Sequence, residues 1–207
     1  MNEKMKEKID LLIKNLKRRT FLPHYCENSQ QAVQKILELI PETASVGIGG
    51  SMTLKDMDIP NILKNRGNNV FSAGFTNNMT NEEIYKNAAF SDVYMTSVNA
   101  ITTDGELINI DGRGNRVAAI LYGPPVVIAV VGINKLVDNQ CDAISRVRNI
   151  ASPQNCIRLN KNTPCSITGK CHYCYPPQTI CRSTVITHFP SSGKKFHIII
   201  INEKIGY

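Results

Sequence analysis

The chain has 207 residues, of which 42% are hydrophobic and 20% charged, and its formal net charge at pH 7 is +7. Such a length suffices to bury a substantial core, and the balance of apolar and charged residues excludes a disordered chain. The longest apolar runs are far shorter than the roughly 20 residues of a membrane helix, and the charged N-terminus lacks a signal peptide, so we expect a cytoplasmic protein without a membrane partner.

The N-terminal region, residues 1–40, is expected to hold two helices. Apolar residues repeat at helical spacing over residues 5–16, and a second helix is predicted at residues 29–40, after a loop at residues 21–28. Residues 1–19 contain seven basic and three acidic side chains, but no aromatic residue lies among them for stacking on bases. This pattern favours a solvated helix face over a nucleic-acid partner.

Short strands and helices alternate through the middle of the chain. Strands are expected at residues 44–48, 69–73, 93–97, 107–110 and 126–131, and helices within residues 51–66 and at 80–90, 116–121 and 138–150. A Thr-Asn-Glu-Glu capping box opens the second of these helices. The last strand is rich in β-branched residues, which predicts a central strand buried on both faces. The alternation predicts an α/β fold with three layers around a mostly parallel sheet.

The C-terminal region shows a different pattern. Two apolar stretches, residues 183–189 and 196–202, flank a Pro-Ser-Ser-Gly-Lys turn, which predicts an antiparallel hairpin at the edge of the sheet. No composition change marks a domain boundary. We therefore expect one domain over residues 1–207, with a cysteine-rich metal-binding segment at residues 160–182 and the hairpin within residues 183–207.

Four of the seven cysteines crowd into seventeen residues near the C-terminus. Cytoplasmic chains rarely form disulfides, so clustered thiols indicate a metal site. One tight Cys-x2-Cys pair between two looser cysteines favours an iron–sulfur cluster, above all of the [4Fe–4S] type, with zinc as the alternative. The expected metal ligands are Cys165, Cys171, Cys174 and Cys181. The other three are expected to be small buried hydrophobic residues, Cys26 and Cys141 lying away from the metal and Cys156 elsewhere in the core.

A glycine-rich loop follows the first predicted strand. Gly47, Gly49, Gly50 and Ser51 lie where that strand gives way to a helix, and free backbone N–H groups at such a junction can hold an anion. The loop is not a dinucleotide fingerprint, because Met52 occupies the third glycine position, and it is not a P-loop. A tight turn between strand and helix explains it equally well.

A second polar stretch occupies residues 99–116. Its arginines offer forks for a carboxylate or phosphate, and its aspartates can hold hydroxyl groups, although the ordinary turn of a hairpin is the alternative. Lys135 follows the predicted central strand, at the edge where open α/β sheets bind ligands, although a lysine there is usually a surface charge. The expected ligand-binding residues are Gly47, Gly49, Gly50, Ser51, Asn99, Asp104, Asn109, Asp111, Gly112, Gly114, Asn115, Arg116 and Lys135.

Several blocks of the sequence, in order, resemble the LUD-domain family, which is named for lactate utilisation proteins. They are residues 47–54 (GIGGSMTL), 99–105 (NAITTDG), 109–119 (NIDGRGNRVAA), 132–137 (GINKLV), 163–174 (TPCSITGKCHYC) and 181–182 (CR). The resemblance implies an isomerase/CoA-transferase-like α/β fold and a part in the oxidation of lactate to pyruvate beside iron–sulfur partners. No residue matches the catalytic glutamate of CoA transferases or the acidic base of sugar-phosphate isomerases.

These features favour a lactate-utilisation-type protein, an iron–sulfur redox component in the oxidation of lactate or a related 2-hydroxy acid. The expected partners are a small anionic substrate, either a 2-hydroxy acid or a phosphorylated compound, and a redox partner protein. Two alternatives stay open: an isomerase- or transferase-like enzyme for a phosphorylated or CoA-linked anion, with a structural metal, and a non-enzymatic binding module. For electron transfer, the cysteines should lie near the ligand pocket, where a right-handed crossover after the central strand would bring them.

Overall fold

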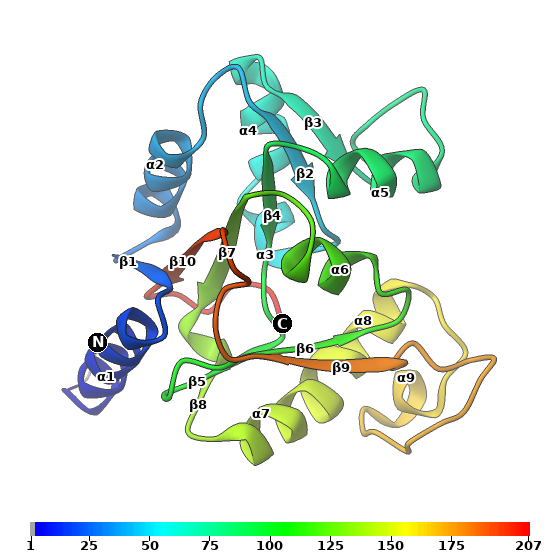
Figure 1. The fold of residues 1–207 in the computed structure, drawn as a ribbon. Helices are drawn as coiled ribbons and strands as arrows, with labels where there is room; N and C mark the ends of the chain where they lie inside the picture. The colour runs from blue at the N-terminus through cyan, green and yellow to red at the C-terminus, as the bar shows by residue number, and fades with distance from the viewer. Residues whose placement is uncertain (1–2) are drawn as a thin grey trace.

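Two β-sheets organise the chain, and both arise from runs of apolar and β-branched residues (Figure 1). The structure is a computed structural model that describes residues 3–207. The larger sheet has the strand order β1 (Leu22–Cys26), β10 (Lys195–Ile201), β7 (Val126–Gly132), β4 (Val93–Thr96), β2 (Ser45–Ile48) and β3 (Asn69–Ser72). The smaller sheet has the order β8 (Leu136–Val137), β5 (Ala100–Thr102), β6 (Leu107–Asp111) and β9 (Ser183–Thr187).

Strand β7 lies near the centre of the larger sheet, in which neighbouring strands pair in parallel. It pairs with β10 on one side and with β4 on the other, and its residues from Val127 to Gly132 are buried. Because a parallel strand in this position is covered on both faces, its sequence is apolar throughout rather than alternating. The predicted central strand and the mostly parallel α/β sheet are confirmed.

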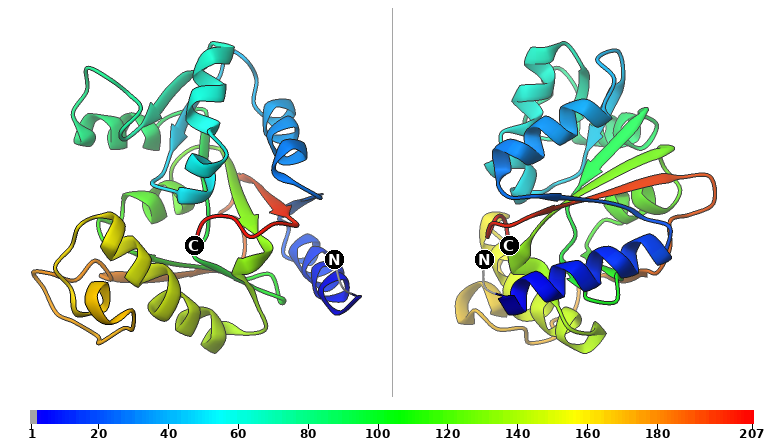
Figure 2. Two further views of the ribbon diagram at one scale, coloured as in Figure 1. Left: turned by 180° about the vertical axis from the view of Figure 1, so that it is seen from behind. Right: turned by 90° about the vertical axis from the view of Figure 1, so that its left-hand side faces the viewer.

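Helices cover both faces of the larger sheet and produce three layers. One face carries α2 (Ser29–Leu39), α3 (Met52–Asp56) and α4 (Ile59–Arg66). The other face carries α1 (Glu3–Arg18), α5 (Asn81–Ala89), α6 (Asn115–Leu121) and the smaller sheet. In the right-hand view of Figure 2, α2 and α1 lie on opposite sides of strands β1 and β10. Within the described residues, no helix combines the length and apolar character that crossing a membrane requires.

A long helical run backs the smaller sheet. It consists of α7 (Gln140–Arg146), the π-helical segment η2 (Val147–Ala151) and α8 (Ser152–Arg158), and the short α9 (Pro164–Thr168) follows. Ala143, Val147 and Ala151 of this run belong to the core under the sheet. The helix expected at residues 138–150 thus continues through α8, and Pro153, which has no backbone N–H to donate, lies where the π-helical segment passes into α8.

Two expectations about strands are wrong. Residues 183–189 and 196–202 do not form a hairpin, because β9 pairs antiparallel with β6 in the smaller sheet whereas β10 lies between β1 and β7 in the larger one. The run from Ile198 to Ile201 is apolar and buried throughout, which is the pattern of a parallel strand covered on both faces. The loop expected at residues 21–28 contains the edge strand β1, where Pro23 is tolerated.

Local helix signals were more reliable than strand pairing. The hydroxyl of Thr80 accepts a hydrogen bond from the backbone N–H of Glu83 (3.3 Å), and the Glu83 carboxylate accepts one from the backbone N–H of Thr80 (2.7 Å). The predicted capping box is therefore confirmed, and it begins α5 at Asn81. Such a signal depends only on residues close together in the chain.

Gly47 brings the larger sheet close to α5, and substituting it tests this packing. In Gly47→Ala the new Cβ would lie 2.3 Å from the carbonyl oxygen of Ala88, whereas a Cβ at Gly50 would meet nothing within 4 Å. We expect Gly47→Ala to lower the free energy of unfolding by about 1–3 kcal/mol, and Gly50→Ala to leave it almost unchanged. Urea denaturation of both variants measures the difference, and equal midpoints would contradict the packing described.

Candidate functional site

The carboxyl ends of three neighbouring strands open onto one cavity. Gly50 and Ser51 follow β2, residues 97–99 follow β4, and Lys135 lies in the 3₁₀ turn η1 (Ile133–Lys135) that follows β7. These residues line a cavity of about 1000 Å³. Open parallel sheets bind their ligands at this edge, beyond the ends of the strands. The topology therefore gathers residues from three distant parts of the sequence at a position suited to a ligand.

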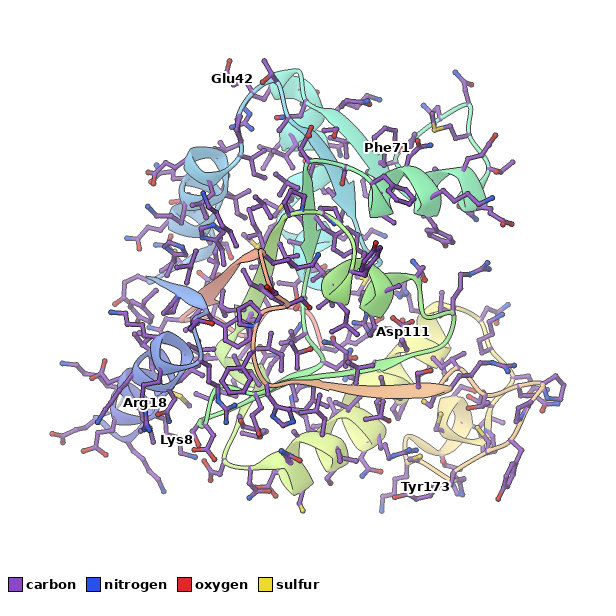
Figure 3. All side chains as sticks on the ribbon, in the orientation of Figure 1. Lys8, Arg18, Glu42, Phe71, Asp111 and Tyr173 are labelled. Carbon is purple, nitrogen blue, oxygen red and sulfur yellow. The ribbon has the colours of Figure 1, made fainter. Side chains whose placement is uncertain are left out.

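Three further segments contribute to the wall of the cavity. The turn from β6 into α6 contributes residues 110–113, 115 and 116, while α8 contributes Asn155 and Arg158. The cysteine segment contributes residues 177–182. Figure 3 shows Asp111 where the chain leaves β6 and Tyr173 at the outer edge of the cysteine segment. The segment expected to bind a metal thus forms part of the wall of this cavity.

Arg116 is held firmly in this wall. Its Nη2 donates to the side-chain oxygen of Asn99 (3.0 Å) and to the carbonyl oxygen of Ile110 (2.8 Å). Its Nε donates to a carboxylate oxygen of Asp111 (3.2 Å), with which it forms an ion pair. Most of the guanidinium is therefore bonded to the protein. Arg116 holds the segments of the cavity wall together and also adds a positive charge to it.

Lys135 is the most deeply buried charged side chain of the cavity wall. Only 2% of its surface is exposed, although it lines the cavity. Its Nζ donates to the hydroxyl of Thr53 (2.7 Å) and to the hydroxyl of Ser97 (2.8 Å). Among residues 3–207, no carboxylate forms an ion pair with this amine. Buried lysines ordinarily pair with an acid, so a lysine held by two neutral hydroxyls is unusual.

The electrostatic surroundings disfavour the charged form of Lys135. Burial above all lowers the pKa of Lys135 to about 7. The positive charges of Arg146 and Arg116 act in the same direction, and Asp56 opposes them. The neutral amine is consequently far more populated near neutral pH than in an exposed lysine.

The cavity as a whole is strongly cationic. Asp111 is the one side-chain carboxylate among the described residues that line it, and it already pairs with an arginine. The basic lining residues are Arg113, Arg116, Lys135, Arg158, Lys161 and Arg182. Clefts lined by one sign of charge attract ligands of the opposite sign. The arrangement is suited to a small anion.

Most of the ligand-binding residues predicted from the sequence meet at this cavity. Those that line it are Gly50, Ser51, Asn99, Asp111, Gly112, Asn115, Arg116 and Lys135. The glycine loop leads into α3, which has only five residues, and the Ser51 hydroxyl caps that helix by accepting from the backbone N–H of Leu54 (3.3 Å). The tight turn is therefore present, and it places Ser51 in the lining.

The remaining predicted ligand-binding residues, Gly47 among them, lie outside the lining. Gly49 packs against Tyr94, whose phenolic oxygen would lie 2.5 Å from an added Cβ. Asp104 is exposed in the turn between β5 and β6, where its carbonyl oxygen accepts a hydrogen bond from Nε of Arg19, the residue after α1. Asn109 is buried in β6, and its side-chain oxygen has no hydrogen-bond partner among the described residues. Gly114 adopts φ 89° immediately before α6, a left-handed backbone conformation that glycine adopts readily.

Several lining residues were not singled out from the sequence. Ser97 follows β4 and bonds Lys135, and Asn155 and Arg158 belong to α8. Asn155 and Arg158 were missed because the preceding helix was expected to end near residue 150. Arg182 had a signal, because it adjoins the last clustered cysteine.

Two of the predicted metal ligands lie close to the helical run. Cys181 also lines the cavity, and its Sγ is 3.4 Å from the hydroxyl of Ser152. Cys171 Sγ is 3.8 Å from Nη1 of Arg148. Burial raises the pKa of the Cys181 thiol, and the charge of Cys171 raises it further, so these two thiols lie near enough to interact.

The other cysteines lie in different surroundings. Cys165 Sγ is 3.7 Å from the Sγ of Cys156, a buried residue that the spacing had not included in the site. Cys174 lines a second cavity, of about 600 Å³. Cys26 is buried in the core of the larger sheet, as expected, whereas Cys141 is exposed on α7 and not a core residue.

The clustered cysteines are suitable metal ligands by their chemistry, but their positions do not form a metal site. Four thiols on a segment with prolines and glycine are a donor set for an iron–sulfur cluster or zinc. Within residues 3–207, however, no three His, Cys, Asp or Glu side chains are placed so that they could hold a metal ion. The metal ligands predicted from the sequence therefore stay a prediction.

Replacing Lys135 tests the cost of burying its amine. Because the folded-state pKa is lowered to about 7, the unfolded chain binds more protons above that pH, and stability contributed by this site rises with pH. We expect Lys135→Met to be more stable than the wild type near pH 6, and this advantage to shrink by about 2–3 kcal/mol near pH 9. Urea denaturation at both pH values measures it. The matched control is Lys161→Met, an exposed lining position, and a pH-independent difference for Lys135→Met would contradict this account.

Comparisons with known proteins agree with the fold. The family model of the LUD domain matches residues 9–201. Among solved structures, the chain is similar to a DUF162 family protein from Deinococcus radiodurans, with a TM-score of 0.56 and 13% sequence identity over 96% of this chain and 98% of that chain. At such an identity the similarity shows a shared fold. No curated protein matches the sequence. Since the family model spans nearly the whole chain, including the strand ends and the cysteine segment, the protein belongs to the LUD-domain family.

Proposed function

We propose that the cavity binds a small carboxylate, a 2-hydroxy acid such as lactate, and that the adjacent cysteine segment carries an iron–sulfur cluster that takes part in its oxidation. One observation carries the proposal: a cationic cavity at the carboxyl edge of the larger sheet has part of the cysteine segment as its wall. An anion bound in this cavity would lie beside the cysteine segment, which supports a joint role for the two.

The charge of the lining supports an anionic ligand. Arg113, Arg158 and Arg182 are exposed. The Arg113 guanidinium lies 5.3 Å from the ring centre of Tyr85, and Arg158 bonds Asn155, so neither is paired with a carboxylate in these contacts. Guanidinium groups with unused N–H donors bind carboxylates through paired hydrogen bonds.

Neutral polar groups in the same lining support a hydroxylated ligand. Ser51, Ser97 and Asn115 offer hydroxyl and amide groups at the ends of the strands and at the start of α6. A hydroxyl on the carbon next to a carboxylate can both donate and accept, so such groups can distinguish a 2-hydroxy acid from a simple carboxylate.

The cysteine segment supports the redox part of the proposal. Its four clustered thiols are the donor type of an iron–sulfur cluster, and such a cluster supplies one-electron transfer. Tyr173, Tyr175 and Ile167 of this segment are exposed. Exposed apolar and aromatic side chains are common where a protein partner docks, which is consistent with a redox partner protein that receives the electrons.

A structural metal is the second candidate for the cysteine segment, with the cavity then serving a phosphorylated or CoA-linked anion. Cys174 lines the second cavity, away from the cationic one. This position favours a structural metal, because a metal that only holds the segment in place need not lie beside the bound anion. Zinc would suit this role.

Metal and sulfide analysis separates the two candidates. We expect anaerobically purified protein to contain iron and acid-labile sulfide and to absorb visible light. Cys174→Ser should lose most of the iron, because it removes one of four thiols. Cys141→Ser is the matched control, since this exposed cysteine lies on α7 and outside the motif, and it should keep the iron. Zinc without sulfide would overturn the redox proposal.

Ligand binding tests the cationic cavity separately. Arg182→Met removes an exposed lining charge, and we expect it to weaken lactate binding about tenfold or more, because a hydrogen bond to a charged group contributes about 1.5–3 kcal/mol. Arg18→Met, at an exposed position of α1 outside the lining, should leave binding unchanged. Isothermal titration with lactate and with inorganic phosphate measures both. Tighter binding of phosphate would favour the second candidate, and equal affinity of the two variants would contradict the assigned site.

A further inference from the structure

We propose that Lys135 forms a reversible imine with the carbonyl carbon of a 2-oxo acid bound in the cavity. This inference rests on the proposed anion site, but not on its redox role. It extends the proposed function by assigning covalent chemistry to one side chain and by naming the ligand class, an acid with a carbonyl group next to its carboxylate.

The position of the amine is the first argument. Lys135 extends from η1, directly after the central strand β7, and it lines the cavity although it is almost fully buried. Its Nζ is held between two hydroxyls, those of Thr53 and Ser97, at 2.7 and 2.8 Å. An amine held in this way has a fixed location and a lone pair whenever it is unprotonated, and that lone pair is not consumed by a carboxylate.

The electrostatics supply the second argument. Arg146 from α7 and Arg116 from α6 face the same region and disfavour a further positive charge, while Asp56 of α3 has a smaller opposite effect. Lysines that act as nucleophiles toward carbonyl groups are those whose protonation is suppressed by burial or by neighbouring cations. A lysine that only bound an anion would gain from staying charged, so this environment is better suited to a nucleophile.

The rest of the lining supplies the third argument. A 2-oxo acid carries a negative charge one bond away from its electrophilic carbon. Arg116 lines the cavity within electrostatic reach of Lys135, and its Nη1, which the hydrogen bonds described above do not use, can hold the carboxylate. The lining thus contains both partners that such a ligand requires, a cation for the carboxylate and a neutral amine for the carbonyl.

The reaction balances without an oxidant or reductant. The lone pair of Nζ forms a bond to the carbonyl carbon, the carbon–oxygen π bond breaks, and the oxygen takes a proton while nitrogen loses one. The resulting carbinolamine then loses its hydroxyl group together with the remaining proton of the nitrogen as water, and a carbon–nitrogen double bond forms. The hydroxyls of Thr53 and Ser97, already bonded to Nζ, can exchange protons with it during these steps.

Reductive trapping tests the inference. Wild-type protein is incubated with sodium pyruvate near neutral pH and reduced with sodium borohydride, and the modified peptide is identified by mass spectrometry. We expect a stable secondary amine at Lys135. Lactate has no keto group, so it should give no adduct alone and should compete when added with pyruvate. Labelling spread over exposed lysines, with none at Lys135, would overturn the inference.

Two variants make the assignment specific. Lys135→Gln should abolish the adduct, whereas Lys161→Met, which removes an exposed lysine from the same lining, should retain it. The site of modification in the wild-type protein decides the question even if Lys135→Gln fails to fold.

Parallel binding measurements separate this inference from the proposed function. If pyruvate and lactate both bind but borohydride traps nothing, the imine is overturned and the anion site stands. If neither acid binds and no adduct forms, both are overturned. An adduct at Lys135 in protein that contains no iron supports the imine and counts against the redox role alone.

Discussion

The cavity depends on the way in which Asn99 joins the two sheets. This residue follows β4 of the larger sheet and precedes β5 of the smaller one. Its side-chain oxygen accepts hydrogen bonds from the backbone N–H of Ile110 (3.0 Å) and from Arg116 (3.0 Å), and its backbone oxygen accepts one from Arg146. Asn99 therefore fixes β6 and α6 through its side-chain amide, and α7 through its backbone carbonyl, relative to the strand ends. Both arginines that act on Lys135 are oriented by it.

Much of the fold could be predicted because its signals are local. Helical periodicity, the capping box at Thr80 and the apolar run of β7 each depend on residues close together in the sequence. Strand pairing is not local. The stretch containing Ile198 to Ile201 could be recognised as a strand, but its partners, Leu22–Cys26 and Val126–Gly132, are chosen by the packing of the whole sheet.

The candidate site could likewise be predicted only where its residues follow from local sequence signals. Polar residues that directly follow buried strands, such as Ser51 and Asn99, must meet at one edge of a parallel sheet. Arg158 lies on a helix that reaches the cavity only because the π-helical segment η2 and α8 continue the preceding helix. The contact between Cys156 and Cys165 likewise arises from tertiary packing, since α8 and α9 lie against each other, and no spacing rule contains it.

The presence of Cys181 in the cavity wall links two equilibria. Negative charge on this sulfur, whether from loss of its proton or from a bound metal centre of net negative charge, lowers the positive potential that attracts an anion. Binding of the anion must in turn make that negative charge less favourable by the same free energy, because linkage between two sites is reciprocal. If the cavity binds an anion as proposed, its occupancy and the redox or ligation state of the thiol would be coupled through space, without any change in the shape of the protein.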